Sequence, residues 1–189
     1  LKIMLNHKGT IEIETQRLIL RRFANDDSDS MFNNWANDED VSKYMRWQQH
    51  ENIEETKMII NKWLLDYNRE SLYIWAITLK ESDEPIGSIG LFIINENDVC
   101  GDVGYAIGKK YWGKGITTEA LKAVLGFAFE NIGFNRIETY HSINNPASGR
   151  VMQKAGMTFE GFAKQKYKSI SGFEDCNMYS ILKEDFKIQ

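Results

Sequence analysis

The segment Lys110-Tyr-Trp-Gly113-Lys-Gly115-Ile-Thr-Thr-Glu119 places two glycines between a predicted strand, residues 102–107, and a predicted helix that begins at Ile116. Glycine lets a backbone approach a ligand closely, and the first turn of a helix leaves several N–H groups without partners. Together with the positive end of the helix dipole, these groups predict an anion site of diphosphate size, beside three lysines. A plain surface loop that leads into a helix is the alternative at this point.

The segments on either side of this turn predict a mixed sheet with helices. β-forming runs and turn residues predict strands over 17–23, 72–79, 86–94, 136–143, 157–169 and 173–183, with the strands at 72–79 and 86–94 joined as a hairpin. Apolar residues at helical spacing predict helices after Asn25-Asp26-Asp27 and over 53–68, 116–132 and 145–155. This order predicts the mixed α/β class, with helices packed on the faces of a central sheet. We expect one domain over residues 14–187, preceded by an N-terminal extension over 1–13.

Composition excludes several classes of protein. The chain has 189 residues, 42% of them hydrophobic, and a net charge of −4, which suits a single domain with a real core. An acidic chain is a poor sequence-independent binder of nucleic acid. Its two cysteines are too few for a disulfide framework, no Cys/His spacing suggests a metal, and no apolar run is long enough for a membrane helix. We therefore expect a cytoplasmic protein, a monomer or a homodimer, that binds neither nucleic acid nor a membrane.

The same turn offers a rival interpretation as a nucleotide-binding P-loop. Gly108-x4-Gly113-Lys114 matches the start of the motif G-x-x-x-x-G-K-[ST], but Gly115 stands where a Ser or Thr hydroxyl should meet Mg²⁺. The strand predicted over 136–143 does not end in an Asp suited to hold that metal. The P-loop interpretation therefore lacks both the hydroxyl and the aspartate that would hold Mg²⁺.

Further motifs follow in register along residues 14–183. They are Glu14-Thr-Gln-Arg-Leu-Ile-Leu-Arg21, Gly104-Tyr105 ahead of Tyr111-Trp-Gly-Lys-Gly115, Asn145-x-x-Ser148 ahead of Lys154-x-Gly156, and Glu160-Gly161. In this order they resemble the GNAT N-acetyltransferases, most closely the branch that acetylates the N-terminal alanine of ribosomal proteins. The signature turn of that family, Gln/Arg-x-x-Gly-x-Gly/Ala, is matched here with lysine in the first place.

The resemblance implies a single-domain GNAT-like fold and acetyl-CoA as the acetyl donor, with no metal. The sheet would be twisted and mostly antiparallel, with helices on both faces and a splay between two central parallel strands. The diphosphate would lie on the backbone of the glycine turn, and the pantetheine arm would lie along the strand before it. The residues implied in cofactor binding are Tyr105, Ala106, Ile107, Lys110, Tyr111, Trp112, Gly113, Lys114, Gly115, Ile116, Thr117, Asn145 and Ser148.

Acetyl transfer to an amine needs a polarised thioester, a group that takes the amine proton and a proton for the leaving thiolate. A backbone N–H of the splayed strand can polarise the thioester. Ser148 is the candidate that protonates the thiolate; many family members use a Tyr of this helix, and Met152 occupies that position here. Glu160, Asp102 and His141, in that order, are candidates for the general base.

The acceptor side is predicted from fewer residues. Trp47, between the first two predicted helices, and Tyr167, in the closing hairpin, are candidate substrate-binding residues. Resemblance to the ribosomal branch makes the N-terminal α-amine of a protein, such as a ribosomal one, the expected acceptor. The alternatives are a small amine (a polyamine, an amino acid or a drug) and a non-catalytic module that binds acyl-CoA.

Overall fold

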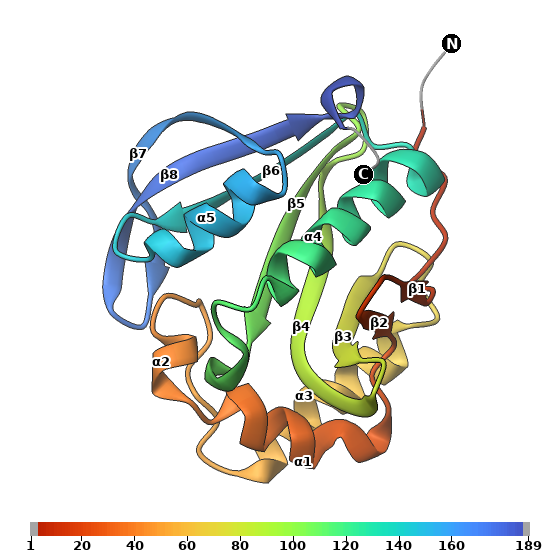
Figure 1. The fold of residues 1–189 in the computed structure, drawn as a ribbon, viewed down its shortest axis with the longest axis vertical. Helices are drawn as coiled ribbons and strands as arrows, with labels where there is room; N and C mark the ends of the chain where they lie inside the picture. Colours follow the sequence, from red (N-terminus) through yellow and green to blue (C-terminus); the bar gives the residue numbers. More distant parts are fainter. Residues whose placement is uncertain (1–3, 187–189) are drawn as a thin grey trace.

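A computed structural model describes residues 4–186 of the chain, which form one eight-stranded sheet with helices on both faces (Figure 1). The strand order is β1-β2-β3-β4-β5-β6-β8-β7. Every neighbouring pair is antiparallel except β5 and β6, which are parallel. The strands are β1 (Ile13–Glu14), β2 (Leu18–Arg21), β3 (Tyr73–Leu79), β4 (Ser82–Asn95), β5 (Cys100–Ile107), β6 (Arg136–Ser142), β7 (Thr158–Ser169) and β8 (Gly172–Leu182). The predicted class and fold are confirmed.

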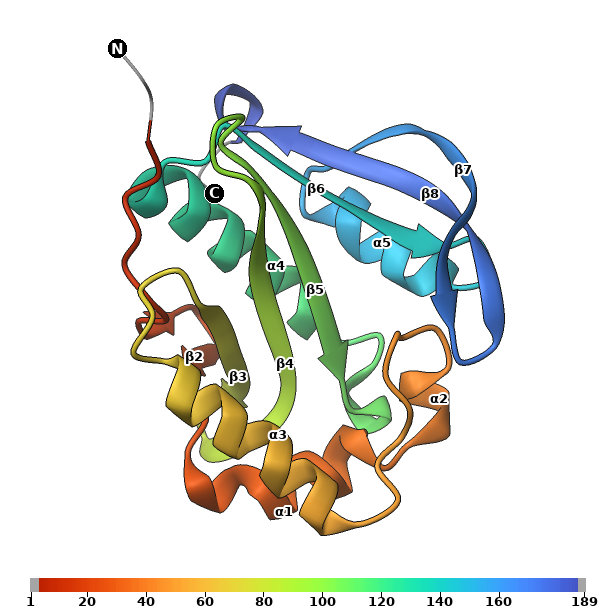
Figure 2. The ribbon, with the colours of Figure 1, turned by 180° about the vertical axis from the view of Figure 1, so that it is seen from behind.

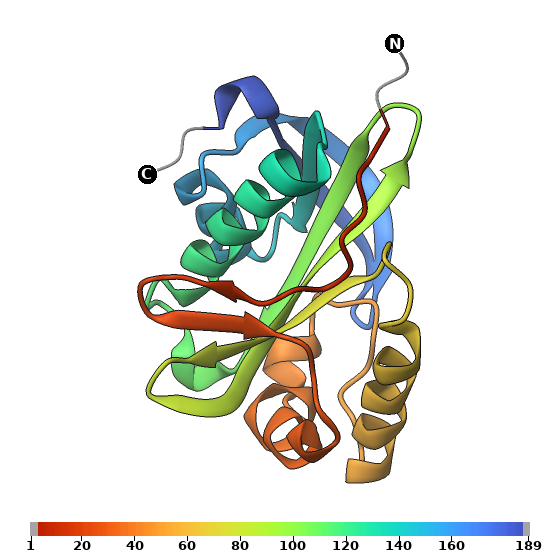
Figure 3. The ribbon, with the colours of Figure 1, turned by 90° about the vertical axis from the view of Figure 1, so that its right-hand side faces the viewer.

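Helices cover both faces of the sheet. One face carries α4 (Ile116–Phe127) and α5 (Pro146–Lys154), and the other carries α1 (Ser28–Met31) and α3 (Ile53–Asp66), as the edge-on view in Figure 3 shows. The short α2 (Glu39–Ser42) lies near the far ends of β5 and β6. Alternate strand residues point to opposite faces, so the sheet has two cores. Val103 and Ile107 of β5 belong to the core under α4, whereas Ala106 belongs to the core with Trp35 and Ile60.

The parallel pair β5–β6 separates soon after it begins. It comprises three residue pairs, of which Asp102–Glu138 is the last. One further contact, from the Thr139 hydroxyl to the Val103 carbonyl at 2.9 Å, follows before the strands diverge (Figures 1 and 2). Figure 2 shows the segment that connects α2 to α3 lying across the open end of the resulting V. The predicted splay is therefore present, and it leaves backbone groups of β5 beyond Asp102 without a strand partner on the β6 side.

Local structure follows most of the predicted elements, but β1 and α2 were not predicted, and two predicted segments differ. The first helix is divided into a 3₁₀ turn η1 (Asn25–Asp27), α1 and a π-helical turn η2 (Phe32–Ala36). The hairpin between β3 and β4 turns at Lys80–Glu81 and not over residues 80–85, because β4 already begins at Ser82. The pairing of β3 with β4 shifts register twice near this turn, so residues 82–85 belong to the strand. A second π-helical turn, η4 (Ala128–Ile132), extends α4 up to Gly133, whose φ of +95° ends the helix. The remaining turns are η3 (Lys109–Tyr111) and η5 (Lys183–Asp185).

The described part of the N-terminal segment lies against the domain. Leu5 is buried in the core under α4, and the Asn6 N–H donates to the Ile132 carbonyl at 2.8 Å. Residues 1–3 of the predicted extension and residue 187, the predicted domain end, lie outside the described residues. Cys100 and Cys176 are both buried free thiols. Within residues 4–186, no helix has the length and apolar character that crossing a membrane requires.

Candidate active site

The glycine turn has the backbone geometry of an anion site. Gly113 and Gly115 adopt left-handed φ values of +73° and +74°, which favour glycine. A Cβ added at Gly113 would meet no atom within 4 Å, so this position opens onto free space. The first α-helical hydrogen bond runs from Glu119 N–H to the Gly115 carbonyl at 3.1 Å, so the N–H groups that precede it face the mouth of the turn. Such a geometry suits an anion.

The charges around this turn are distributed unequally. Lys109 is ion-paired with Asp40, so its charge is compensated. The ammonium groups of Lys110 and Lys114 lie 5.7 and 5.6 Å from the centre of the Tyr111 ring, and within residues 4–186 neither forms an ion pair. These two lysines are the ones available to an anion.

Arg17, part of the motif Glu14–Arg21 but not among the predicted site residues, connects the β1–β2 turn to the glycine turn. Its Nη1 donates to the Lys114 carbonyl at 3.0 Å, and its Nε donates to Glu119 at 2.6 Å. The Thr15 hydroxyl and the Arg17 N–H also donate to Glu119, which lowers the pKa of this carboxyl. These contacts are not visible in the sequence, because Lys114 and Glu119 lie about a hundred residues away from Arg17.

On the α4/α5 face, two of the predicted residues meet across the V. The Tyr105 hydroxyl of β5 lies 3.0 Å from Ser148 Oγ of α5, and burial raises the pKa of Tyr105. Asn145 caps α5 by accepting from the Ser148 N–H at 3.4 Å. Met152, at the position where many relatives carry a Tyr, is buried in the core. A phenol is therefore present beside Ser148, but it comes from the strand instead of the helix.

The rest of the predicted cofactor set lies along the end of β5 and the turn. Ala106, Ile107, Ile116 and Thr117 are buried. The Trp112 side chain is 46% exposed. Its indole N–H donates to the Ile107 carbonyl at 2.9 Å, and this bond holds the glycine turn against the end of β5.

Asp102 is a largely buried carboxylate at the point where β5 and β6 separate. Burial raises its pKa to about 6, and the neighbouring Glu138 charge adds to the rise. One oxygen, Oδ1, is buried without a hydrogen-bond partner in the described part of the chain. Asp102 lies on the face opposite Val103, away from α4, because alternate residues of β5 point to opposite faces.

Glu160, the first candidate for the general base, accepts hydrogen bonds at both of its carboxylate oxygens. Arg136 donates to both of its oxygens, at 2.9 and 2.5 Å, and the Ser180 hydroxyl donates at 2.6 Å. These contacts lower the pKa of Glu160 to about 2. A carboxylate that holds its proton so weakly and is tied to an arginine is poorly suited to accept a proton near neutral pH.

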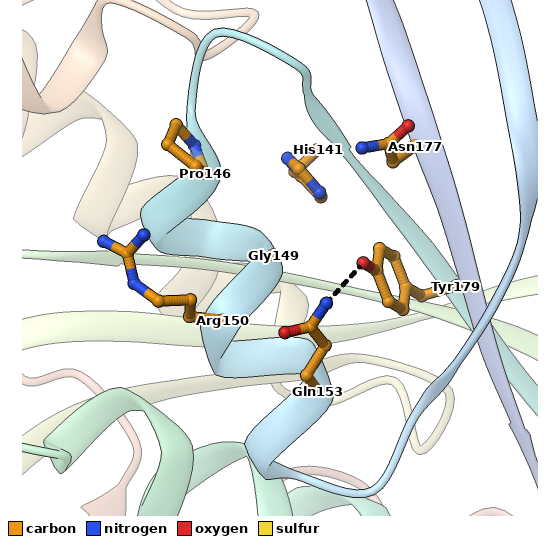
Figure 4. A pocket seen from close by; sticks show the side chains of 7 residues that line it. All are labelled: His141, Pro146, Gly149, Arg150, Gln153, Asn177 and Tyr179. Carbon is orange, nitrogen blue, oxygen red and sulfur yellow. Dashed lines mark hydrogen bonds between the residues drawn. The ribbon is translucent and has the colours of Figure 1, made fainter.

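His141 lies in a separate pocket of about 200 Å³ between α5 and β8, shown in Figure 4. Its Nδ1 bonds to the Ser142 carbonyl at 2.7 Å, and a Cβ added at Gly149 would lie 2.5 Å from its Nε2. Gln153 donates to the Tyr179 hydroxyl at 2.9 Å across the same pocket. The ring packs under α5, on the opposite face from Asp102, and it does not meet the other two candidate bases.

The two predicted acceptor residues make different contacts. Trp47 is half-buried and packs against the core that contains Trp35, with its ring 6.0 Å from that of His50. Tyr167 is 8% exposed, and its hydroxyl donates to the Tyr44 carbonyl at 2.6 Å. The described residues contain no group of three or more His, Cys, Asp and Glu side chains placed to hold a metal ion.

A slot between two splayed parallel strands, followed by a turn suited to an anion, is compatible with an acyl carrier that bears a diphosphate. Comparison with known proteins agrees: residues 17–158 match the model of the acetyltransferase (GNAT) domain. This chain belongs to the GNAT acetyltransferase family, and it is an acyltransferase of the N-acetyltransferase type.

Individual relatives cover most of the chain. An uncharacterized N-acetyltransferase, YoaA of Bacillus subtilis, is 30% identical over 90% of this chain and 96% of its own length. The ribosomal-protein-serine acetyltransferase of Escherichia coli is 26% identical over 57% of this chain and 60% of that protein. The structure of RimL, a ribosomal L7/L12 α-N-protein acetyltransferase in complex with coenzyme A, superposes with a TM-score of 0.80 at 20% identity, over 91% of this chain and 98% of that one. Ribosomal-protein acetyltransferases are thus among its homologues.

Proposed function

We propose that this chain transfers the acetyl group of acetyl-CoA to a primary amine, and that the acceptor is the N-terminal α-amine of a protein. The observation that carries the proposal is the V between β5 and β6, with the glycine turn at one end and Asp102 at its apex. Acetyl-CoA supplies an acyl group activated as a thioester. The existence of a coenzyme A complex in the RimL structure and the ribosomal-protein enzymes among the homologues support this choice of donor and acceptor.

In this proposal the residues of the turn bind the diphosphate. The N–H groups at the start of α4 donate to it, and Lys110 and Lys114 add charge. The unpaired edge of β5 beyond Asp102 offers backbone groups to the pantetheine amides and to the carbonyl oxygen of the thioester. Asn145 holds the start of α5 near this edge.

Asp102 takes the proton of the amine, directly or through a water. A carboxyl with a pKa of about 6 is ionised at neutral pH and still basic enough to accept a proton. The C–N bond forms as the C–S bond breaks, and the Ser148 hydroxyl, oriented by Tyr105, donates a proton to the sulfur. Glu160 and His141 take no part, because one is bound to Arg136 and the other is enclosed under α5.

Thermal unfolding with acetyl-CoA, CoA and Mg·ATP added separately tests the donor. A ligand at a hundred times its dissociation constant stabilises a protein by about 2.7 kcal/mol, which for a chain of this size raises Tm by roughly 5–10 °C. Stabilisation by acetyl-CoA and CoA, with thiol release when N-terminal peptides are added, is the expected result. Stabilisation without thiol release from any peptide or small amine would indicate a binding module, and stabilisation by Mg·ATP alone would overturn the choice of donor.

A further inference from the structure

Two positive side chains lie over a pair of tyrosines on the face of the sheet that carries Asp102. The rings of Tyr140 and Tyr167 have centroids 5.4 Å apart. The Arg46 guanidinium lies 4.9 Å from the centre of the Tyr167 ring and donates to the Tyr140 hydroxyl at 2.8 Å. The Lys166 ammonium lies 5.5 Å from the centre of the Tyr140 ring. We call these four residues the tyrosine cluster.

Neither cation of the cluster has a carboxylate partner. Over residues 4–186, Arg46 and Lys166 form no ion pair, and both are exposed. Glu174, whose charge acts on Tyr167, is buried and accepts hydrogen bonds from Ser142 and Ser169 at 2.5 and 2.6 Å. It is enclosed by these two hydroxyls. A guanidinium has five N–H donors in a fork that matches a carboxylate, so most of those of Arg46 are available to a ligand.

The cluster is held in place by the surrounding backbone. The bond from the Tyr167 hydroxyl to the Tyr44 carbonyl joins β7 to the segment before Arg46. In β7, Gln165 has a φ of +47°, rare for a residue with a side chain, where the pairing with β8 shifts register. The Gln165 N–H donates to the Asp175 carboxylate at 2.8 Å, which stabilises this bulge next to Lys166. The bulge changes the direction in which Lys166 and Tyr167 leave the strand.

Strand geometry sets the spacing between the cluster and Asp102. Glu138 pairs with Asp102, and Tyr140 lies two residues further along β6 on the same face. Adjacent strands lie about 4.8 Å apart and two residues advance by about 6.6 Å; because β6 diverges from β5 beyond Glu138, the Cα atoms of Asp102 and Tyr140 lie at least roughly 8 Å apart. The charge of Lys166 also reaches Asp102, where it opposes the effect of burial on the pKa of that carboxyl.

We propose that the tyrosine cluster binds a carboxylate of the acceptor, namely an acidic side chain at the second or third residue of the peptide whose N-terminal amine lies at Asp102. This inference rests on the proposed function. An extended chain advances about 3.3–3.6 Å per residue, so a side chain one or two residues from the amine spans the distance. The amine and carboxylate of a free amino acid are too close together to reach both groups. The acceptor would thus be recognised by opposite charges at its two contact points.

The test compares peptides that begin Ala-Asp and Ala-Asn, together with alanine and its amide, as acceptors for the full chain. Wild type is expected to prefer Ala-Asp over Ala-Asn by roughly tenfold to a hundredfold in kcat/KM, the range of a charge-assisted hydrogen bond. Arg46→Gln and Lys166→Gln should each remove most of this preference by raising KM for Ala-Asp. Arg46→Lys should restore it partly, because it keeps the charge and loses the fork. Lys62→Gln, which removes an equal charge from the exposed side of α3, is the matched control.

Calorimetric binding of the acetylated products, N-acetyl-Ala-Asp and N-acetyl-Ala-Asn peptides, in the presence of CoA gives a readout without turnover. Tighter binding of the acidic product, lost in Arg46→Gln, supports the cluster even if no peptide is acetylated, in which case the proposed function alone fails. Equal kcat/KM and equal binding for the two peptides would overturn the cluster and leave the acetyltransferase standing. A preference for free alanine over its amide, with none between the peptides, would overturn the peptide assignment.

Discussion

Asp102 of β5 and Glu138 of β6 face each other as the last pair of the parallel ladder, and only one of them has a cationic partner. Glu138 accepts from Arg136 Nε at 2.9 Å, whereas one oxygen of Asp102 is buried without a hydrogen bond within the described residues. The two carboxyls at this rung therefore differ in their charge compensation. The uncompensated one is at the apex of the V, where the proposed reaction needs a base.

Replacing Asp102 is expected to impair catalysis strongly. Asp102→Asn keeps the size of the side chain and removes its basicity, so kcat/KM should fall by roughly 10²–10⁴ at pH 7. In the wild type, kcat/KM should decline as pH falls below about 6, where the carboxyl becomes protonated. The variant should lose this limb of the pH profile. A variant with near-normal kcat/KM and the same limb would exclude Asp102 as the base.

The same substitution is expected to stabilise the fold at neutral pH. Burial raises the folded pKa of Asp102 from 3.8 to about 6, so the folded state binds its proton more tightly and stability falls as pH rises from about 4 to 6. Above pH 6 the ionised group costs up to about 3 kcal/mol, at 1.36 kcal/mol per pKa unit. Urea unfolding should show Asp102→Asn more stable than wild type at pH 7 and similar to it at pH 4. Equal differences at both pH values would contradict a titrating, buried Asp102.

Glu160→Gln is expected to leave activity within about threefold of wild type, since the carboxylate is bound to Arg136 and is not the base in this mechanism. The contribution of Glu160 to stability depends on pH in the opposite direction to that of Asp102. The lowered pKa of Glu160 stabilises the fold above pH 4.5, and this contribution is lost as pH falls toward 2. Because the Glu160 side chain is 41% exposed, the variant should lose only about 1 kcal/mol or less at pH 7. A hundredfold loss of kcat/KM would instead restore Glu160 as a candidate base.

Gly113→Ala is expected to weaken acetyl-CoA binding. A Cβ there meets no protein atom, but it projects into the space above the turn and strains a φ of +73°. The dissociation constant of CoA, measured by calorimetry, should rise at least tenfold. Gly133→Ala is the matched control, because Gly133 also has a positive φ and open space around its Cβ position, and it lies at the other end of the helix. An equal rise in both variants would show that general strain, not the turn, is responsible.

Tyr105→Phe and Ser148→Ala are expected to impair the same step, the protonation of the leaving thiolate. If the Tyr105 hydroxyl orients that of Ser148, each variant should lower kcat more than it raises KM, and the double variant should lose little more than Ser148→Ala alone. Thiol release under saturating acetyl-CoA measures the effect. Losses that multiply in the double variant would show that the two hydroxyls act independently.

The sequence by itself predicted most of the strands and helices, the family and a candidate anion turn. Glycines at 113 and 115, a strand before them and an amphipathic helix after them are local features, and local propensity and periodicity are visible in one dimension. The splay and the residues along β5 followed from the family resemblance, and the arrangement of β5 and β6 agrees with it. The division of the first helix into 3₁₀, α and π turns was not foreseen, because packing against the sheet overrides propensity there.

Only the tertiary structure distinguished among the candidate bases. Asp102, Glu160 and His141 are similar in sequence terms, and what separates them is their surroundings in the folded chain. One Asp102 oxygen has no hydrogen-bond partner within residues 4–186, Glu160 is bound by Arg136, and His141 packs against Gly149 of α5. The tyrosine cluster joins residues 46, 140, 166 and 167, and the contact between Arg46 and Tyr140 alone spans more than ninety positions. Proton affinity and charge recognition depend on burial and on through-space distance, and these are properties of the folded chain.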